Sequence, residues 1–571
     1  MNFQTLPMDA ASILALTWND YEPYYKDLES CPLNTGTIEG WLNDWSTLAA
    51  TADEQYWRLY IATTVNTADQ TAEDLFNKYI EEIQPAVKTA EQKLKDKLIG
   101  SGLSPKSFET ALRMMRAETE IFTEENLPLL AEEQKLVTEY NKLIGSLTVM
   151  WDGQERTMAQ MFPLLMDRDR SVRQRAWETR FARIMEERQL INEVWEKFVP
   201  LRLKIAENAD MPDYRAYTWK QKFRFDYSPQ DCKSFHAAIE QVVVPAAQRA
   251  YERRRQHLGI DSVRPWDRDV NPYGDTVVRP YESIDEFKSK TRAIFEQVDL
   301  KFGEYFQIMM DENLLDLETR RNKAPGAYSL GLHVAHRPFV FMSNTQTPDD
   351  VQTILHEGGH AFHEFERAHV HFYQRGEIYL PAEFAEVASM SMELLASPYV
   401  TRACGGYYTD SEAARAMIDN LEGIIKFWPY MALVDAFQHW IYENPHQSSD
   451  ASKCEEKWAE LWDRFMVGID YSGLEDARKT YWHRQAHIFQ SPFYYVEYGL
   501  AQLGAVQVWA NSRHDQKKAV ADYRKALALG ATVPLPELFT AAGAKFAFDA
   551  ATLKEAVDLM EEVIEEMEAR L

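Results

Sequence analysis

The feature that most limits the possible folds is a helical periodicity running from about Leu48 to Ile260. Apolar residues recur there every three or four positions, as in SVRQRAWETRFARIMEERQLINEVWEKFVPLRLKIAENA, which is typical of amphipathic helices. Helical patterns return at Thr347 and continue to the C-terminal ATLKEAVDLMEEVIEEMEARL, whose apolar stripe we expect to be packed core. The sequence therefore predicts a mainly α-helical protein.

The helical pattern is interrupted between about residues 261 and 350. Pro- and Gly-containing segments such as RPWDRDVNPYGD and NKAPGAYSLGLHVAHRP surround one short β-like run, PFVFMS, which predicts a small sheet. A chain of 571 residues is too long for one hydrophobic core. We expect an N-terminal helical lobe, residues 1–200, and a second lobe, residues 201–571, that carries the site described below and the C-terminal helices.

The charge balance excludes two classes of partner. Lys and Arg total 62 against 89 Asp and Glu, a formal net charge of −27, and such a surface repels nucleic acid and anionic membranes. Neither an export signal nor an apolar membrane-spanning stretch is evident. Four separated cysteines without C-x-x-C spacing suggest neither a disulfide framework nor a thiolate metal site. We expect a soluble protein of the reducing cytoplasm.

The candidate metal-binding and catalytic residues lie in one segment, TPDDVQTILHEGGHAFHEFERAH. Its first residues predict a helix start, because Thr347 can cap, Pro348 suits the first position and acidic residues favour the positive end of the dipole. His356 and His360 are one turn apart, so both imidazoles can reach one metal ion at about 2.0–2.1 Å. Glu357 points about 100° round the helix, which suits a general base beside the metal.

Gly358 and Gly359 lie inside this predicted helix, where each costs about 1 kcal/mol relative to Ala. Something should require them. We expect another backbone, or the substrate, to approach the helix closely at these glycines.

A catalytic zinc normally has three protein ligands and leaves a fourth position for water. The next helical stretch, LPAEFAEVASMSMELLAS, offers Glu383, Glu386 and Glu393, and spacing alone does not choose among them. One could ligate while a neighbour orients a ligating imidazole. His363 also falls on the metal-facing side, although packing or hydrogen bonding is the favoured interpretation for it.

The sequence resembles the thimet oligopeptidase family of zinc peptidases, closest to its oligoendopeptidase F and Pz-peptidase branch. The resemblance rests on KAPGAYS at 323–329, PFVFMS, DDVQTILHEGGH at 349–360, PAEFAEVASMSMELL, HIFQSPFYYVEYGL at 487–500 and PLPELFTAAGAKFAFD. It implies a two-lobed, clam-like, mainly α zincin with a small β-sheet beside the active-site helix and a deep central channel. It also implies one Zn²⁺ per chain and cleavage of short oligopeptides, with PFVFMS as the sheet edge for the substrate.

The resemblance further implies particular roles. Glu386 matches the third zinc ligand, which leaves Glu393 as the partner of a ligating imidazole. His487 and Tyr498 match groups that act at the transition state; among the tyrosines, Tyr494 and Tyr495 remain close alternatives and candidate substrate contacts. Independently of the resemblance, the loop residue His333 is a candidate substrate contact, because it lies close in sequence to the predicted edge strand PFVFMS.

The sequence thus predicts a zinc-dependent endopeptidase in which Glu357 is the general base. The alternatives are a metallocarboxypeptidase and a non-catalytic zinc-dependent peptide-binding protein. The expected partners are short peptides, with neither nucleic acid nor membrane. The sequence leaves open a monomer or a small homo-oligomer.

Overall fold

The computed structural model describes residues 1–274, 278–375 and 380–571. It divides into two compact units, each assembled from three separate segments: unit 1 from Met1–Arg116, Val278–Ala413 and Gly504–Phe546, and unit 2 from Ala117–Val277, Ala414–Leu503 and Ala547–Leu571. This division differs from the expected lobes 1–200 and 201–571, because contacts between distant segments define each unit. Residue 200 lies inside a helix of unit 2.

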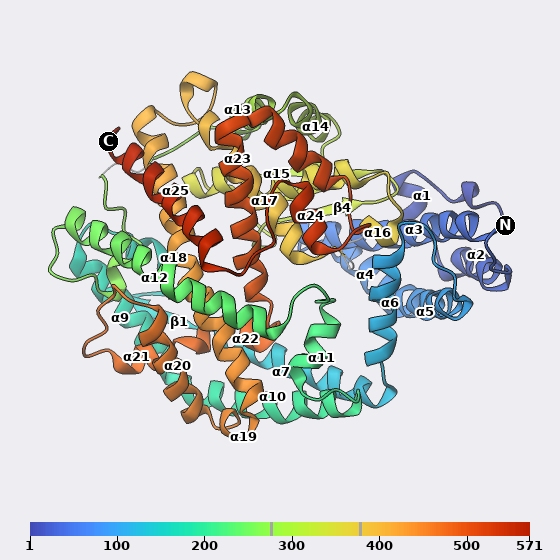
Figure 1. Cartoon of the computed structure of the whole chain (residues 1–571), viewed down its shortest axis with the longest axis horizontal. Helices are drawn as coiled ribbons and strands as arrows, with labels where there is room; N and C mark the ends of the chain where they lie inside the picture. Colours follow the sequence, from blue (N-terminus) through green and yellow to red (C-terminus); the bar gives the residue numbers. More distant parts are fainter. Residues whose placement is uncertain (275–277, 376–379) are drawn as a thin grey trace. The chain divides into compact units, whose positions relative to one another are not determined.

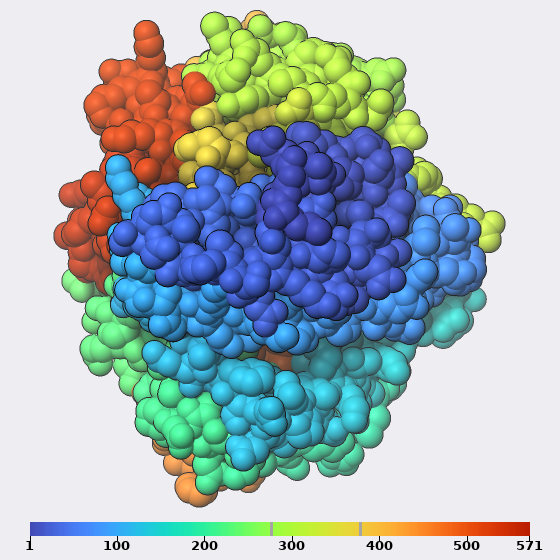
Figure 2. Space-filling model, turned by 90° about the vertical axis from the view of Figure 1, so that its right-hand side faces the viewer, coloured from blue at the N-terminus to red at the C-terminus, as the bar shows by residue number. Residues whose placement is uncertain are grey.

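Unit 1 is a helical unit with one small sheet (Figure 1). Its helices are α1 (Ala10–Leu14), α2 (Trp18–Ser30), α3 (Ile38–Val65), α4 (Gln70–Lys78), α5 (Gln84–Ser101), α13 (Ile284–Val298), α14 (Leu300–Asp311), α15 (Pro348–Arg367), α16 (Phe372–Arg375), α17 (Ala382–Ala396) and α24 (Leu535–Ala541). The N-terminal helices, blue in Figure 2, form a continuous layer on the face turned toward the viewer.

The sheet of unit 1 has three strands in the order β3-β5-β4: β3 (Leu315–Asp316), β4 (Tyr328–Leu332) and β5 (Arg337–Phe341). β5 pairs antiparallel with β4, from Tyr328 opposite Phe341 to Leu332 opposite Arg337, and parallel with β3. The expectation that PFVFMS forms the sheet edge is therefore wrong, because both sides of β5 carry a partner strand. Both longer strands contact α15, so the predicted sheet does lie beside that helix.

Unit 2 is also mainly helical. Its elements are α7 (Leu127–Gly145), the hairpin β1 (Thr148–Trp151) and β2 (Gln154–Thr157), α8 (Phe162–Leu165), α9 (Arg170–Glu186), α10 (Arg188–Asn208), α11 (Tyr214–Gln221), α12 (Pro229–Leu258), α19 (Pro445–Ser448), α20 (Ala451–Phe465), α21 (Glu475–Lys479), α22 (Ala486–Gln490) and α25 (Ala550–Glu568). The C-terminal stripe is core as predicted at Leu553, Val557, Met560 and Ile564, which are buried, whereas Met567 at its end is partly exposed. α25 packs beside α12 (Figure 1).

Three of the five boundaries between the units lie inside helices: α6 (Glu109–Ile121), α18 (Asp410–Glu443) and α23 (Tyr495–Leu527). α23 is two helices joined by a kink, where Asp515 has non-helical backbone angles. No helix in the described part of the chain has the length and apolar character needed to cross a bilayer. No disulfide joins the four cysteines, all of which lie among the described residues.

Candidate metal centre

Two packed helices of unit 1 bring together the predicted metal ligands. α15 begins where expected: Thr347 is its N-cap, Pro348 follows, and the Thr347 amide donates to the Asp350 carboxylate (2.9 Å). The Glu386 Oε2 atom, from α17, lies 3.5 Å from His356 Nε2 and 3.7 Å from His360 Nε2. Local capping signals fix the first helix, and packing of α17 against it supplies the carboxylate.

This donor set fits zinc. Four donors at the usual zinc distances of about 2.0–2.1 Å are roughly 3.3 Å apart in a tetrahedron, close to the separations seen here. The three side chains are only partly exposed, and two imidazoles with one carboxylate leave room for a fourth ligand. Of the three glutamates that spacing left open, Glu386 is the one whose carboxylate lies with both imidazoles.

Glu393 orients His356 through the ring nitrogen that faces away from Glu386. Its Oε1 lies 2.6 Å from His356 Nδ1, so the hydrogen bond directs Nε2 of that ring toward Glu386. Burial lowers the pKa of His356, but the hydrogen bond to Glu393 and the charges of Glu393 and Glu386 outweigh it and raise this pKa to about 9. Gln352 also donates to Glu393, a partner that sequence reasoning missed. It lies one turn before His356, and that i, i+4 spacing was the available signal.

Glu357 lies beside the donor set and takes no part in it. Its side chain is 7% exposed, and its Oε2 has no hydrogen-bond partner among the described residues. Burial raises the pKa of Glu357 to about 7, against the charge of His356 and with the charges of Glu386 and Glu393. A carboxyl group with this pKa can both accept and release a proton near neutrality.

Gly359 meets the expectation of a close backbone approach, whereas Gly358 faces a side chain. A Cβ atom on Gly359 would lie 2.6 Å from the Ala388 carbonyl oxygen and from Ser389 Cα, both backbone atoms of α17. A Cβ atom on Gly358 would lie 2.4 Å from the Phe295 ring. Gly359 therefore lets α17, with Glu386, approach the histidines closely, while Gly358 leaves room for the Phe295 ring of α13.

Two further candidates from the sequence, Glu383 and His363, lie outside the donor set. Glu383 is buried at the start of α17 and is not among the three clustered donors. His363 is also buried, its ring faces Phe384 edge-on, and burial lowers its pKa well below the usual value. These positions agree with packing as the main role of His363.

The four predicted residues of the downstream segment lie together in unit 2, whereas the donor set belongs to unit 1. The His487 ring stacks on Tyr494 at 5.8 Å between centroids, and it lies 5.0 Å from Tyr495 and 6.2 Å from Tyr498. Gln485 Nε2 is 2.8 Å from His487 Nδ1. Burial and the charge of Lys222 lower the pKa of His487. The cluster is thus an aromatic group around one imidazole.

His333 occupies the turn between β4 and β5 and is 2% exposed. Its Nε2 lies 3.4 Å from Asp53, and its carbonyl accepts a hydrogen bond from Arg375. It lines a cavity of about 1060 Å³ in unit 1 together with His336 and His371. Its contact with substrate stays a prediction.

A helix with two imidazoles one turn apart, a glutamate between them and a carboxylate on the adjacent helix defines the metal centre of a zinc-dependent hydrolase. Residues 164–558 match Peptidase family M3, and the chain belongs to that family. The resemblance inferred from the motifs is therefore confirmed.

Individual relatives agree with this assignment. The chain is 30% identical over 135 residues to the oligoendopeptidase F homolog of Mycoplasma genitalium, which covers 21% of this chain and 22% of that protein. The structure of Pz peptidase A with an inhibitor is similar over 99% of both chains, with 26% identity and a TM-score of 0.83. A protein assigned as an oligoendopeptidase F gives 26% identity, 99% coverage of both chains and a TM-score of 0.82.

Proposed function

We propose that this protein is a zinc-dependent endopeptidase that hydrolyses internal bonds of short oligopeptides. The observation that carries the proposal is the donor set of His356, His360 and Glu386, with the buried Glu357 carboxyl group beside it. Membership of a peptidase family and similarity to Pz peptidase A support the same activity. One zinc ion per chain would be held by these three side chains.

The residues of the chain have separate parts in the reaction. Zinc, when bound, makes water a better nucleophile near neutral pH and polarises the scissile carbonyl group. Glu357 accepts the proton of the attacking water and transfers it to the leaving amine, for which its pKa of about 7 is suited. Glu393 keeps the His356 ring in its ligating orientation. From the family resemblance, His487 and Tyr498 would donate hydrogen bonds to the negative charge that develops on the carbonyl oxygen.

The peptide backbone would add to the sheet of unit 1 as an extra strand. β5 is central and the edge strand β3 has only two residues, so the strand available for this role is the other edge strand, β4. A narrow, deep channel of the kind the family resemblance implies would admit unstructured oligopeptides and exclude folded proteins. The expected result is slow cleavage of intact casein beside rapid cleavage of a nonapeptide; equal rates would contradict this restriction.

The proposed setting is the cytoplasm, with short peptides as the partners. The acidic composition and four cysteines without disulfides support this setting. Cell fractionation with an antibody against the chain would test it, and enrichment in the secreted fraction would contradict it.

The activity is tested with a peptide blocked at both ends, analysed by mass spectrometry with and without a chelator. An endopeptidase cuts this peptide internally, and the chelator abolishes cleavage. A metallocarboxypeptidase would leave the blocked peptide intact but shorten a version with a free C-terminus. A peptide-binding protein without catalysis would retain both peptides unchanged.

A further inference from the structure

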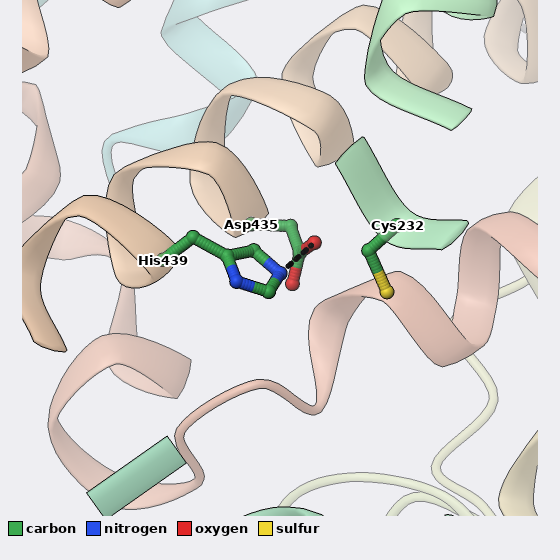
Figure 3. A group of neighbouring side chains, drawn as sticks. All are labelled: Cys232, Asp435 and His439. Carbon is green, nitrogen blue, oxygen red and sulfur yellow. Dashed lines mark ion pairs between the residues drawn. The ribbon is translucent and has the colours of Figure 1, made fainter. Parts of the chain in front are cut away.

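A second cluster of metal-type ligands lies in unit 2. Cys232, Asp435 and His439 each offer one donor atom, and these atoms all lie within 4.8 Å of one another. Figure 3 shows the three side chains gathered around one point, with Asp435 between the other two. The donor set of unit 1 is the other such group among the described residues. The unit 2 cluster has no part in the proposed hydrolysis.

The cluster is built from two helices with matched spacing. α12 contributes Cys232 and His236, and α18 contributes Asp435 and His439. Each pair is separated by four positions and therefore projects from one face of its helix. These four side chains are at most 3% exposed. Two buried faces thus present a thiol, two imidazoles and a carboxylate to each other.

Among the described residues, no lysine or arginine pairs with the Asp435 carboxylate. Its ion pairs in the described structure are with imidazoles: His236 Nε2 at 2.7 Å and His439 Nε2 at 3.3 Å from Oδ2. Its Oδ1 is buried and has no hydrogen-bond partner among the described residues. A fully buried carboxylate of this kind calls for a cation or for more donors.

The donor chemistry favours a borderline divalent ion. A thiolate, an imidazole and a carboxylate form a set that zinc and cobalt accept, whereas calcium and magnesium prefer oxygen ligands alone. The His439 to Asp435 distance of 3.3 Å equals the spacing of tetrahedral zinc donors, about 3.3 Å. His236 would orient the carboxylate from behind, as hydrogen-bonded partners of ligating groups do.

The contact between Arg215 and His439 must change when the metal binds. Arg215 Nη1 lies 3.4 Å from His439 Nδ1, which must carry the proton when Nε2 is a ligand. The same guanidinium already pairs with Glu443, and its Nη2 lies 3.6 Å from Asp213. These carboxylates can hold Arg215 when the long contact to the ring is lost.

We propose that Cys232, Asp435 and His439 bind a second divalent metal ion, of the zinc class, which fastens α12 to α18. The site is buried and has no part in the proposed hydrolysis, so the role of the ion would be structural. Binding displaces the thiol proton of Cys232 to solvent and involves no redox change.

Cobalt substitution tests the site in the full-length protein. The donors proposed in unit 1 are nitrogen and oxygen only, so a thiolate-to-cobalt charge-transfer band in the near ultraviolet reports the unit 2 site alone. The apoprotein, titrated with Co²⁺, is expected to bind two ions per chain and to develop this band. Cys232→Ala should lose the band and one ion but keep peptide cleavage. Cys454→Ala, which removes another fully buried thiol, should change neither quantity.

Folded wild-type protein that binds no more than one cobalt ion and shows no sulfur band would overturn the proposal. The cluster would then be a hydrogen-bonded network of polar groups. This decision rests on wild-type protein, so it stands even where Cys232→Ala fails to fold. Glu386→Gln separates the two sites: it should lose one ion and peptide cleavage while keeping the sulfur band.

Discussion

Gly359→Ala tests whether close packing of α15 and α17 builds the metal centre. The added methyl group would lie 2.6 Å from the Ala388 carbonyl oxygen and Ser389 Cα. Ordinary contact begins near 3.4 Å, so α17 must move away by about 0.8 Å. The carbonyl group cannot simply turn aside, because it also accepts a hydrogen bond from Tyr523 (2.6 Å).

Two energies oppose each other in this variant. Overpacking costs about 1–3 kcal/mol, and replacing a mid-helix glycine by alanine returns about 1 kcal/mol. Gly423→Ala in α18 is the matched control, since nothing lies within 4 Å of its added methyl group. The control should therefore be more stable than wild type by about 1 kcal/mol, and Gly359→Ala should be less stable than the control by about 1–3 kcal/mol.

The more specific readout is zinc affinity, measured by competition with a chelator. Metal ligands tolerate displacements of about 0.2 Å, so moving Glu386 by about 0.8 Å relative to His356 and His360 should weaken zinc binding at least about tenfold. Gly423→Ala should bind zinc as wild type does. If Gly359→Ala matched the control in both stability and zinc affinity, the close approach would not be what positions Glu386.

Three further results are expected. Because the pKa of His356 is raised to about 9 in the metal-free protein, zinc binding near neutral pH should release a proton from that ring, and affinity should increase with pH until about 9. Glu393→Gln should remove most of this proton release and weaken zinc binding about 10–100-fold. Calorimetry in buffers of different ionisation enthalpy measures the number of protons released, and an unchanged number would contradict the raised pKa of His356. Tyr498→Phe should lower kcat about 10²–10³-fold with zinc retained, while Tyr494→Phe should have a smaller effect, and the reverse order would transfer the role to Tyr494.

Local signals in the sequence predicted the helix that carries the two histidines. The cap at Thr347, the proline after it and the i, i+4 histidines all act within a few residues, so α15 begins where expected. The glycine pair also predicted a close backbone contact, and the structure places it at Gly359, against α17. Residue identity and spacing were sufficient for these features.

Features that depend on tertiary contacts were harder to predict from the sequence. Spacing left Glu383, Glu386 and Glu393 as alternatives, and only the packing of α17 on α15 separates them geometrically. The edge position expected for PFVFMS was wrong, because a two-residue strand, β3, gives too weak a pattern to predict the pairing on that side of β5. The interleaved units were missed for the same reason: their contacts join segments far apart in the sequence.

The cluster of Cys232, Asp435 and His439 shows this limit most clearly. Two i, i+4 pairs on distant helices give no shared motif, so the cysteine spacing suggested no thiolate site. The pairs meet only because α12 and α18 are packed in the same unit.

Peptide cleavage by Glu357→Gln tests the central claim most directly. The substitution keeps the shape of the side chain and removes its ability to accept a proton, while the donor set of His356, His360 and Glu386 is untouched. We predict that the variant binds one zinc ion at these residues as wild type does, yet loses nearly all internal cleavage of an end-blocked peptide. Near-normal cleavage by the zinc-loaded variant would contradict the assignment of Glu357 and the mechanism built on it.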